Sequence, residues 1–195
     1  MRFNLKNTLF CFALKEEAKD QFDDLNCLFT DMGKINAAFA LTKHLVLNPE
    51  VEFVVNLGTC GSQNLKPASI VCATTFYQRD WSVPFLTMPT DHFEKITYGI
   101  KIDNILEVAC GTGDSFVSEW PENAPYEIVD MEAFALASVC QKFQKKFICL
   151  KSVSDAAGEN DGLSAIEQWN LYLEKAAHNL RNNINNIENF ADIVK

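Results

Sequence analysis

Continuous apolar runs of strand length recur along the chain and alternate with helical patterns. Residues 8–14 read Thr-Leu-Phe-Cys-Phe-Ala-Leu, without the polar alternation of a half-exposed strand. A run of this kind is typical of a strand buried on both faces of a sheet. Further strands are predicted over residues 26–30, 51–57, 105–110 and 147–153, and over residues 69–77, which are rich in β-branched side chains.

Three longer segments have the pattern of helices. The first begins after the turn residue Gly33 and runs to about Leu47, before Pro49. The second follows Asp130 and stays apolar on nearly every side until Gln141, which predicts a buried helix. The third covers about 163–189, with apolar residues on one face. These are Ile166, Trp169, Leu173, Ala177 and Leu180.

Strands that alternate with helices predict an α/β fold, here a three-layer α/β/α sandwich with helices on both faces of one sheet. A length of 195 residues suits one full core, so we expect residues 1–195 to form a single domain. Prolines and isolated aromatic residues interrupt the pattern between residues 84 and 102, and we assign no element there.

Two carboxylates stand at the front of the buried helix. Asp130 is suited to cap the helix, and the positive end of a helix favours both acids. Glu132 lies beside residues that must be buried, where an unpartnered acid costs on the order of several kcal/mol. A ligand rich in hydroxyl groups would be a natural partner for Glu132.

Other acids follow the predicted strands. Glu16 and Glu17 come after the first strand and Asp155 after the strand at 147–153. Open α/β sheets bind their ligands at the carboxyl ends of the strands, so we expect Glu17, Glu132 and Asp155 to converge there. Carboxylates gathered without metal ligands indicate proton chemistry on a polyhydroxylated substrate. The segment Thr59-Cys60-Gly61 is predicted to be a turn whose amides face an anion or a sugar edge.

Composition narrows the classes of partner. A net charge of -9 argues against nucleic acid, and the first apolar run is too short for a membrane span, so we expect a cytoplasmic protein. The seven cysteines form no C-x-x-C pair, and the three histidines are widely separated. We therefore expect reduced thiols, no metal site and no cofactor. The glycines at 111 and 113 do not complete a dinucleotide fingerprint.

Six short motifs follow one another along the chain: Ala13-Leu14-Lys15-Glu16-Glu17, Met32-Gly33-Lys34-Ile35-Asn36-Ala37-Ala38, Asn56-Leu57-Gly58-Thr59-Cys60-Gly61, Gly113-Asp114-Ser115-Phe116-Val117, Val129-Asp130-Met131-Glu132-Ala133 and Val153-Ser154-Asp155-Ala156-Ala157. In this order they resemble the nucleoside phosphorylase/hydrolase superfamily, and most closely its 5'-methylthioadenosine/S-adenosylhomocysteine nucleosidases. The resemblance implies a nucleoside phosphorylase-like sandwich with a central mixed sheet, and hydrolysis of the N-glycosidic bond of a 5'-substituted adenosine.

The resemblance also implies roles for single residues. Asp155 would be the general acid that protonates the adenine leaving group, and Glu17 would activate the attacking water. Glu132, with Met131 beside it, would hold the ribose hydroxyls. The remaining positions would bind substrate: Phe116 and the backbone of Val117 at the base, Thr59, Cys60 and Gly61 along the sugar, and Ser154 next to the acid.

Phosphorylases of this superfamily place arginines around the glycine turn, whereas Asn56 precedes Leu57-Gly58 in this chain. Of the three arginines only Arg79 lies near a motif, and it could form an ion pair with Asp80 or bind the ligand. A single guanidinium group is a poor phosphate site, so we expect water to be the nucleophile. Three alternatives stay open: a phosphorolytic purine nucleoside phosphorylase, a futalosine hydrolase, and a non-catalytic nucleoside-binding protein. We expect a homodimer with a small-molecule nucleoside as its ligand.

Overall fold

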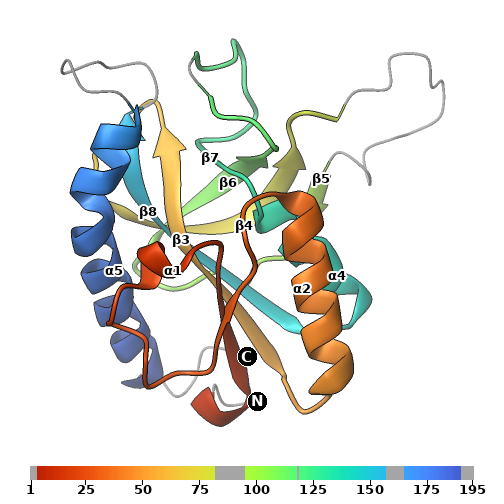
Figure 1. Ribbon diagram of the computed structural model, residues 1–195. Helices are drawn as coiled ribbons and strands as arrows, with labels where there is room; N and C mark the ends of the chain where they lie inside the picture. The colour runs from red at the N-terminus through yellow and green to blue at the C-terminus, as the bar shows by residue number, and fades with distance from the viewer. Residues whose placement is uncertain (1–3, 82–94, 118, 157–164, 190–195) are drawn as a thin grey trace, which may run out of the picture.

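Eight strands pair into one mixed sheet in the computed structural model, which describes residues 4–81, 95–117, 119–156 and 165–189 (Figure 1). The path of neighbouring strands is β2-β1-β3-β7-β6-β4-β5, and β8 pairs with both β3 and β4. The strands are β1 (Thr8–Phe12), β2 (Cys27–Phe29), β3 (Phe53–Ser62), β4 (Ile70–Gln78), β5 (Lys95–Thr97), β6 (Leu106–Thr112), β7 (Ile128–Asp130) and β8 (Lys146–Ala156).

The pairings close a ring of five strands. Strand β8 runs parallel to β3 and antiparallel to β4, β6 runs parallel to β4 and to β7, and β7 pairs antiparallel with β3. The contact between β3 and β7 joins Gly61 to Val129 at the carboxyl end of β3. The ring therefore brings the end of β7 to the edge of the sheet where the parallel strands β1, β3 and β8 also end.

Helices cover both faces of the sheet (Figure 1). Helices α2 (Lys34–Leu47) and α4 (Ala133–Lys142) pack against each other on one face, and α5 (Ala165–Asn189) lies against β3 and β8 on the other with the short α1 (Lys15–Ala18) beside it. A 3-10 turn, η1 (Leu5–Asn7), precedes β1. The predicted α/β/α layers and mixed sheet are confirmed, and the expectation of a single domain stays a prediction.

The buried side chains alternate between two core clusters, one on each face. Strand β1 is wholly buried, as predicted, and it sends Leu9 and Cys11 to the cluster under α2 and α4. Phe10 and Phe12 point the other way, into the cluster under α1 and α5. This two-residue period follows from the pleat of a strand covered on both sides.

Two segments beside the pocket differ from the sequence-based expectation, and β5 lies in the stretch where no element was assigned. The predicted turn at Thr59-Cys60-Gly61 is part of β3, because the strand continues to Ser62 along β8. A shift in register between Cys60 and Gly61 places Gly61 opposite Asp155. Strand β7 was not predicted, since three residues are too few to show a period. The small residues of β3 thus continue the strand and form no turn, and the residue skipped by the register is Ser154 of β8, a bulge of the kind that sheets place next to functional sites.

Candidate active site

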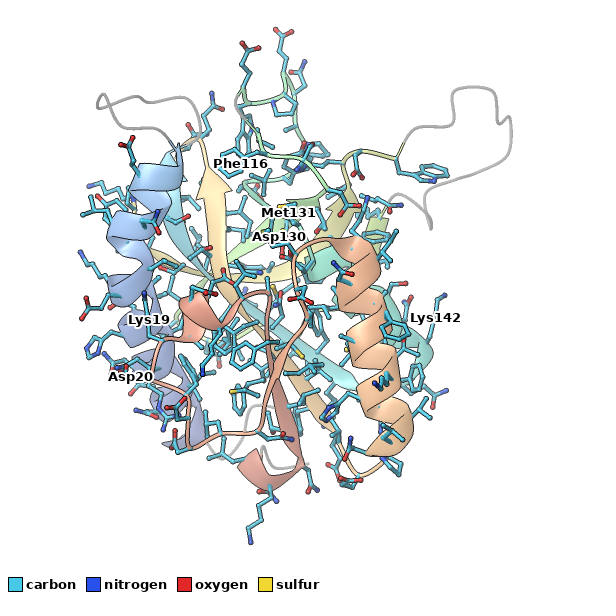
Figure 2. All side chains as sticks on the ribbon, in the orientation of Figure 1. Lys19, Asp20, Phe116, Asp130, Met131 and Lys142 are labelled. Atoms are coloured by element: carbon cyan, nitrogen blue, oxygen red, sulfur yellow. The ribbon has the colours of Figure 1, made fainter. Side chains whose placement is uncertain are left out.

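A pocket of about 410 Å³ opens at the carboxyl ends of the central strands. It combines carboxylates from three segments with apolar side chains, as small-molecule sites commonly do. Figure 2 shows three of its residues, Phe116, Asp130 and Met131, gathered at one end of the molecule, away from Lys142 at the end of α4. The pocket is lined by Ala13, Leu14, Glu17, Met32, Thr59, Cys60, Gly61, Arg79, Ser115, Phe116, Val117, Val129, Asp130, Met131, Glu132 and Ser154.

Glu17 is fixed in the wall of this pocket by Thr59. Its Oε1 accepts hydrogen bonds from the backbone N–H and from the hydroxyl of Thr59, both at 2.8 Å, and its Oε2 accepts one from the backbone N–H of Leu14 at 3.3 Å. The residue is buried, so these donors replace the water that a carboxylate would otherwise bind. Its position after a buried strand agrees with the prediction that this acid reaches the site.

Glu132 stands at the N-terminus of α4, where its side chain makes no capping hydrogen bond to its own helix. Its Oε1 accepts instead from the backbone N–H of Gly33 at 2.9 Å, which ties α4 to the start of α2. Burial, together with the negative charges of Asp130 and Glu17, raises the pKa of Glu132 to about 7, although Lys151 and the Gly33 hydrogen bond act to lower it. Glu132 is therefore close to its titration point at neutral pH.

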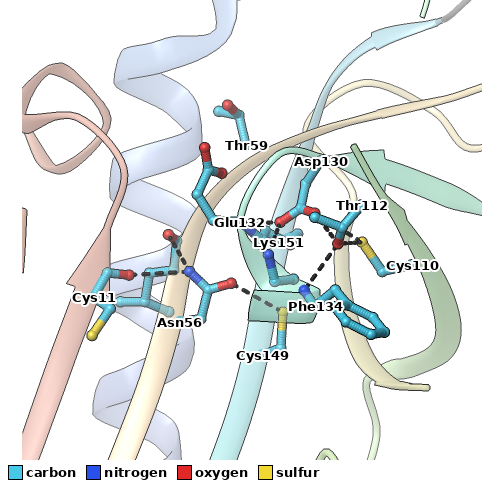
Figure 3. A network of polar contacts seen from close by, with 12 residues as sticks. Cys11, Asn56, Thr59, Cys110, Thr112, Asp130, Glu132, Phe134, Cys149 and Lys151 are labelled. Carbon is cyan, nitrogen blue, oxygen red and sulfur yellow. Dashed lines mark hydrogen bonds and ion pairs between the residues drawn. The ribbon is translucent and has the colours of Figure 1, made fainter. Parts of the chain in front are cut away.

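Asp130 forms a buried ion pair with Lys151, with 3.0 Å between Oδ2 and Nζ (Figure 3). The same oxygen accepts from the N–H of Ala133, the first residue of α4, at 2.9 Å, although the N-cap position is held by Glu132 and not, as predicted, by Asp130. Oδ1 accepts from the hydroxyl of Thr112 at 2.7 Å. Burial acts to raise the pKa of Asp130, but the Lys151 ammonium group and these hydrogen bonds hold it below its ordinary value. Asp130 is thus an ionised member of the site that also binds the first N–H of α4.

The apolar part of the pocket comes from two loops and one helix N-terminus. Met131 lies between the two acids of β7 and α4, and Phe116 and Val117 follow β6. Phe116 is 60% exposed and Met32, beside the start of α2, is 54% exposed. Exposed aromatic and thioether side chains next to a pocket provide flat apolar surface for a planar ligand.

The last predicted binding residues lie on adjacent strands. Thr59, Cys60 and Gly61 line the pocket from β3, and Ser154 lines it from β8. The Ser154 hydroxyl donates to the backbone carbonyl of Cys60 at 3.4 Å. Asp155 follows in β8, and its backbone pairs with Gly61 at the edge of the pocket. The side chain of Asp155 lies outside the described part of the structure, so its predicted role stays a prediction.

Arg79 does not pair with Asp80, so the first of the two alternatives considered for Arg79, an ion pair or a binding role, was wrong. The guanidinium group of Arg79 lines the pocket and donates to the Ser115 hydroxyl at 3.1 Å, to the Gly113 carbonyl at 3.0 Å and to the Ser115 carbonyl. Asp80 instead pairs with Lys34, which sequence neighbours could not reveal because α2 is distant along the chain. Arg79 therefore braces the loop that carries Phe116.

The polar residue that sequence reasoning missed is Lys151. It is the one charged residue in the apolar run from Phe147 to Val153, and it is buried with 2% of its surface exposed. A lysine inside a fully buried strand requires a partner, which is a usable signal. Asn56, whose position argued against a phosphate site, lies behind the pocket and donates to the carbonyls of Cys11 and Leu57 at 3.3 Å each.

Two further observations concern metal binding and membrane-spanning helices. Among the described residues, no group of three or more histidine, cysteine or acidic side chains has an arrangement that would hold a metal ion. Within the same residues, no helix combines the length and the apolar character needed to span a membrane.

Comparison with known proteins agrees with this geometry. A model of the phosphorylase superfamily matches residues 23–187. The 5'-methylthioadenosine/S-adenosylhomocysteine nucleosidase of Bacillus pumilus is 31% identical over 77% of this chain and 74% of its own, and the one of Bacillus velezensis is 28% identical with the same coverage.

Solved structures show the same fold. A futalosine hydrolase mutant of Helicobacter pylori superposes with a TM-score of 0.74 and 19% identity, over 94% of this chain and 98% of its own. A 5'-methylthioadenosine/S-adenosylhomocysteine nucleosidase of Colwellia psychrerythraea, solved in complex with adenine, superposes with a TM-score of 0.77 and 20% identity, over 94% of this chain and 95% of its own. With a superfamily model that spans most of its length and a relative at 31% identity, the chain belongs to the phosphorylase superfamily, in the group of its nucleosidases.

Proposed function

We propose that the protein is a purine nucleosidase that hydrolyses the N-glycosidic bond of a 5'-substituted adenosine, of the 5'-methylthioadenosine or S-adenosylhomocysteine type. The products would be adenine and the free ribose derivative. The observation that carries the proposal is the meeting of two buried carboxylates, Glu17 and Glu132, with the apolar side chains of Phe116 and Met131 in one pocket. The names of the relatives support the same substrate class.

The reaction breaks the bond between the sugar carbon and the base nitrogen, and positive charge builds on the ribose as the bond lengthens. A pocket rich in carboxylates stabilises that charge more in the transition state than in the ground state. Glu17 accepts a proton from water, whose oxygen bonds to the sugar carbon. Asp155 donates a proton to the departing base, so that both electrons of the broken bond leave with adenine.

Glu132 and Met131 are assigned to the ribose. A carboxylate has several acceptor sites, and the hydrogen bond from Gly33 uses one of them on Glu132. The others are available to accept from sugar hydroxyls. Phe116 offers its exposed ring to the face of the base, and the backbone of Val117 supplies polar groups to its edge.

Water is a better nucleophile for this pocket than phosphate. Among the described lining residues Arg79 is the one cation, and its terminal nitrogens already donate to Ser115 and Gly113. A phosphate ion would need several donors that are not committed elsewhere. This arrangement argues against a phosphorolytic enzyme, which is the nearest alternative.

A substrate panel tests the proposal. The protein is incubated with 5'-methylthioadenosine, S-adenosylhomocysteine, adenosine and futalosine, with and without phosphate, and the products are separated by chromatography, with Glu17→Gln as the matched inactive control. Phosphate-independent release of adenine supports the proposal. Strict phosphate dependence would establish a phosphorylase, and turnover of futalosine alone would establish a futalosine hydrolase. Tight binding without release of the base would establish a nucleoside-binding protein. Each of these three outcomes overturns the proposed function.

We also propose that the active form is a homodimer built on α2. One face of this helix packs on α4, while the opposite face exposes large apolar side chains next to the pocket residue Met32. Exposed apolar surface of this extent marks an interaction site. A second copy of the chain is the occupant we favour, because a contact there would also cover the edge of the pocket. The exposed residues are Met32, Ile35, Phe39, Val46 and Leu47.

A further inference from the structure

A single buried cation lies behind the acidic wall of the pocket. Lys151 comes from the middle of β8, it does not line the pocket, and its side chain is 3% exposed. Its Nζ is 3.0 Å from Oδ2 of Asp130, which is 1% exposed. Figure 3 shows the lysine between the strand that carries Asn56 and the residues Asp130 and Thr112. Burial would depress the pKa of Lys151, yet the surrounding negative charge raises it well above its ordinary value.

Groups from five segments of the chain act on this ammonium ion. Three are carboxylates and two are thiols whose pKa is raised by burial, so the thiols stay neutral. Three acids are therefore balanced by one ammonium group. The groups are Glu17 of α1, Asp130 of β7, Glu132 at the start of α4, Cys110 of β6 and Cys149 of β8.

Resting on the nucleosidase function proposed above, we propose that Lys151 is a positioning residue whose buried charge keeps Asp130 ionised and favours the carboxylate form of Glu132, which binds the sugar hydroxyls. The lysine contacts Asp130 and acts on Glu132 through space, so it needs no contact with substrate. An apolar side chain of similar length would fill the same volume, but it would leave Asp130 as an uncompensated buried anion, which costs stability unless Asp130 is replaced as well. The charge is therefore the property that the pocket requires.

The consequence of removing the charge follows from electrostatics. Without the ammonium group, Asp130 would face Glu132 and Glu17 as an uncompensated anion in a poorly solvated site. Like charges at such a distance favour uptake of a proton. Glu132 would take it, because burial and like charges already raise its pKa to about 7, while Asp130 keeps the hydrogen bonds from the Thr112 hydroxyl and the Ala133 N–H that favour its charged form. A protonated Glu132 loses acceptor capacity toward the ribose.

The experiment follows the protonation of Glu132 directly, by NMR of protein with carbon-13 in the glutamate carboxyl groups and with the signal assigned by Glu132→Gln. In Lys151→Met we expect the Glu132 pKa to rise by about one unit or more. Lys151→Arg keeps the charge and should keep the wild-type titration. The double variant Lys151→Met/Asp130→Asn removes both charges and should return the titration toward that of the wild type.

Activity gives the second measurement. The acidic limb of kcat/KM for 5'-methylthioadenosine should move to higher pH in Lys151→Met and stay in place in Lys151→Arg. If the wild type cleaves no nucleoside, the proposed function fails while the NMR titration still tests the lysine. An unchanged Glu132 titration in folded Lys151→Met overturns the inference. Should that variant not fold, the double variant is compared with Asp130→Asn alone: loss of the lysine charge must then raise the Glu132 pKa, and no difference between the two overturns the inference as well.

Discussion

The backbone of Gly58 faces the carboxylate of Glu17 at a distance that leaves no room for a side chain. A Cβ atom added at Gly58 would lie 2.9 Å from Oε1 and 3.2 Å from Oε2 of Glu17. The residue also has a φ of +144°, a conformation that residues other than glycine rarely adopt. This glycine therefore decides how closely β3 approaches the acid proposed to activate water.

We predict that Gly58→Ala displaces the Glu17 carboxylate and strains the strand. Turnover should fall about 10- to 100-fold, because a small misplacement of a catalytic group has effects of that order. The strain should lower the free energy of unfolding by roughly 1–3 kcal/mol. Steady-state kinetics and urea unfolding measure the two effects.

The control for this prediction is the same substitution in a Glu17→Ala background, where the displaced carboxylate is absent. Part of the loss of stability should then disappear, as expected for residues in contact. An additive result in the double variant, or full activity of Gly58→Ala, would contradict the steric coupling between the two residues.

We predict that Asp155→Asn keeps the fold and loses turnover by about 100-fold or more, as expected for loss of a general acid. Its backbone pairs with Gly61 in β8, and an asparagine can make the same pairing. Circular dichroism checks that the variant is folded, and single-turnover kinetics measure the rate of bond cleavage. Ser154→Ala, one residue away and also beside the pocket, serves as the matched control and should lose much less. Near-normal activity of Asp155→Asn would remove this acid from the mechanism.

The elements predicted well from sequence are those with long, uniform apolar patterns. Strand β1, helix α2 and helix α4 were predicted because their buried positions follow the period of the backbone over many residues. Such patterns say which elements exist. They also placed Glu17 and Glu132 at one edge of the sheet, since both acids directly adjoin buried elements.

The features that sequence could not predict depend on contacts between distant segments. Strand β7 exists because three residues find partners in β3 and β6, and the glycine-rich end of β3 stays extended because β8 pairs with it. The ion pair of Lys151 with Asp130 and that of Lys34 with Asp80 likewise join elements far apart in the chain. Local pattern can show that a buried lysine needs a partner, but it does not show which residue that partner is.

The protonation of Glu132 predicts a pH dependence of stability. Its pKa is about 7 in the folded protein and near 4.5 when exposed, so the folded state binds the proton more tightly. Proton binding by Glu132 therefore contributes to the stability of the folded state below about pH 4.5. As the pH rises from there to about 7, this contribution is lost, and the free energy of unfolding falls by up to about 3 kcal/mol. Asp130, whose pKa is lowered from 3.8, acts in the opposite direction and only at more acidic pH.

The measurement compares the wild type with Glu132→Gln by urea unfolding at pH values from 5 to 8. The difference in unfolding free energy between the two proteins should change in favour of the variant as the pH rises, because glutamine does not ionise. Other titrating groups, including His44, are common to both proteins and cancel in the comparison. A difference that is constant across this range would contradict the raised pKa.

The exposed face of α2 gives a prediction about assembly. Ile35 is 80%, Phe39 69% and Val46 63% exposed, and they lie on one side of the helix while Ala37, Leu41 and Leu45 are buried against the core. Phe39→Glu should place a charge in the proposed dimer contact, so the wild type should sediment as a dimer and the variant as a monomer at micromolar concentration. Leu171→Glu changes an equally apolar, 64% exposed residue of α5 and should remain dimeric. A monomeric wild type, or loss of the dimer in the Leu171→Glu variant alone, would show that α2 is not the dimer contact. Loss of the dimer in Phe39→Glu alone would indicate that the second copy binds at this face of α2, next to Met32 and the pocket.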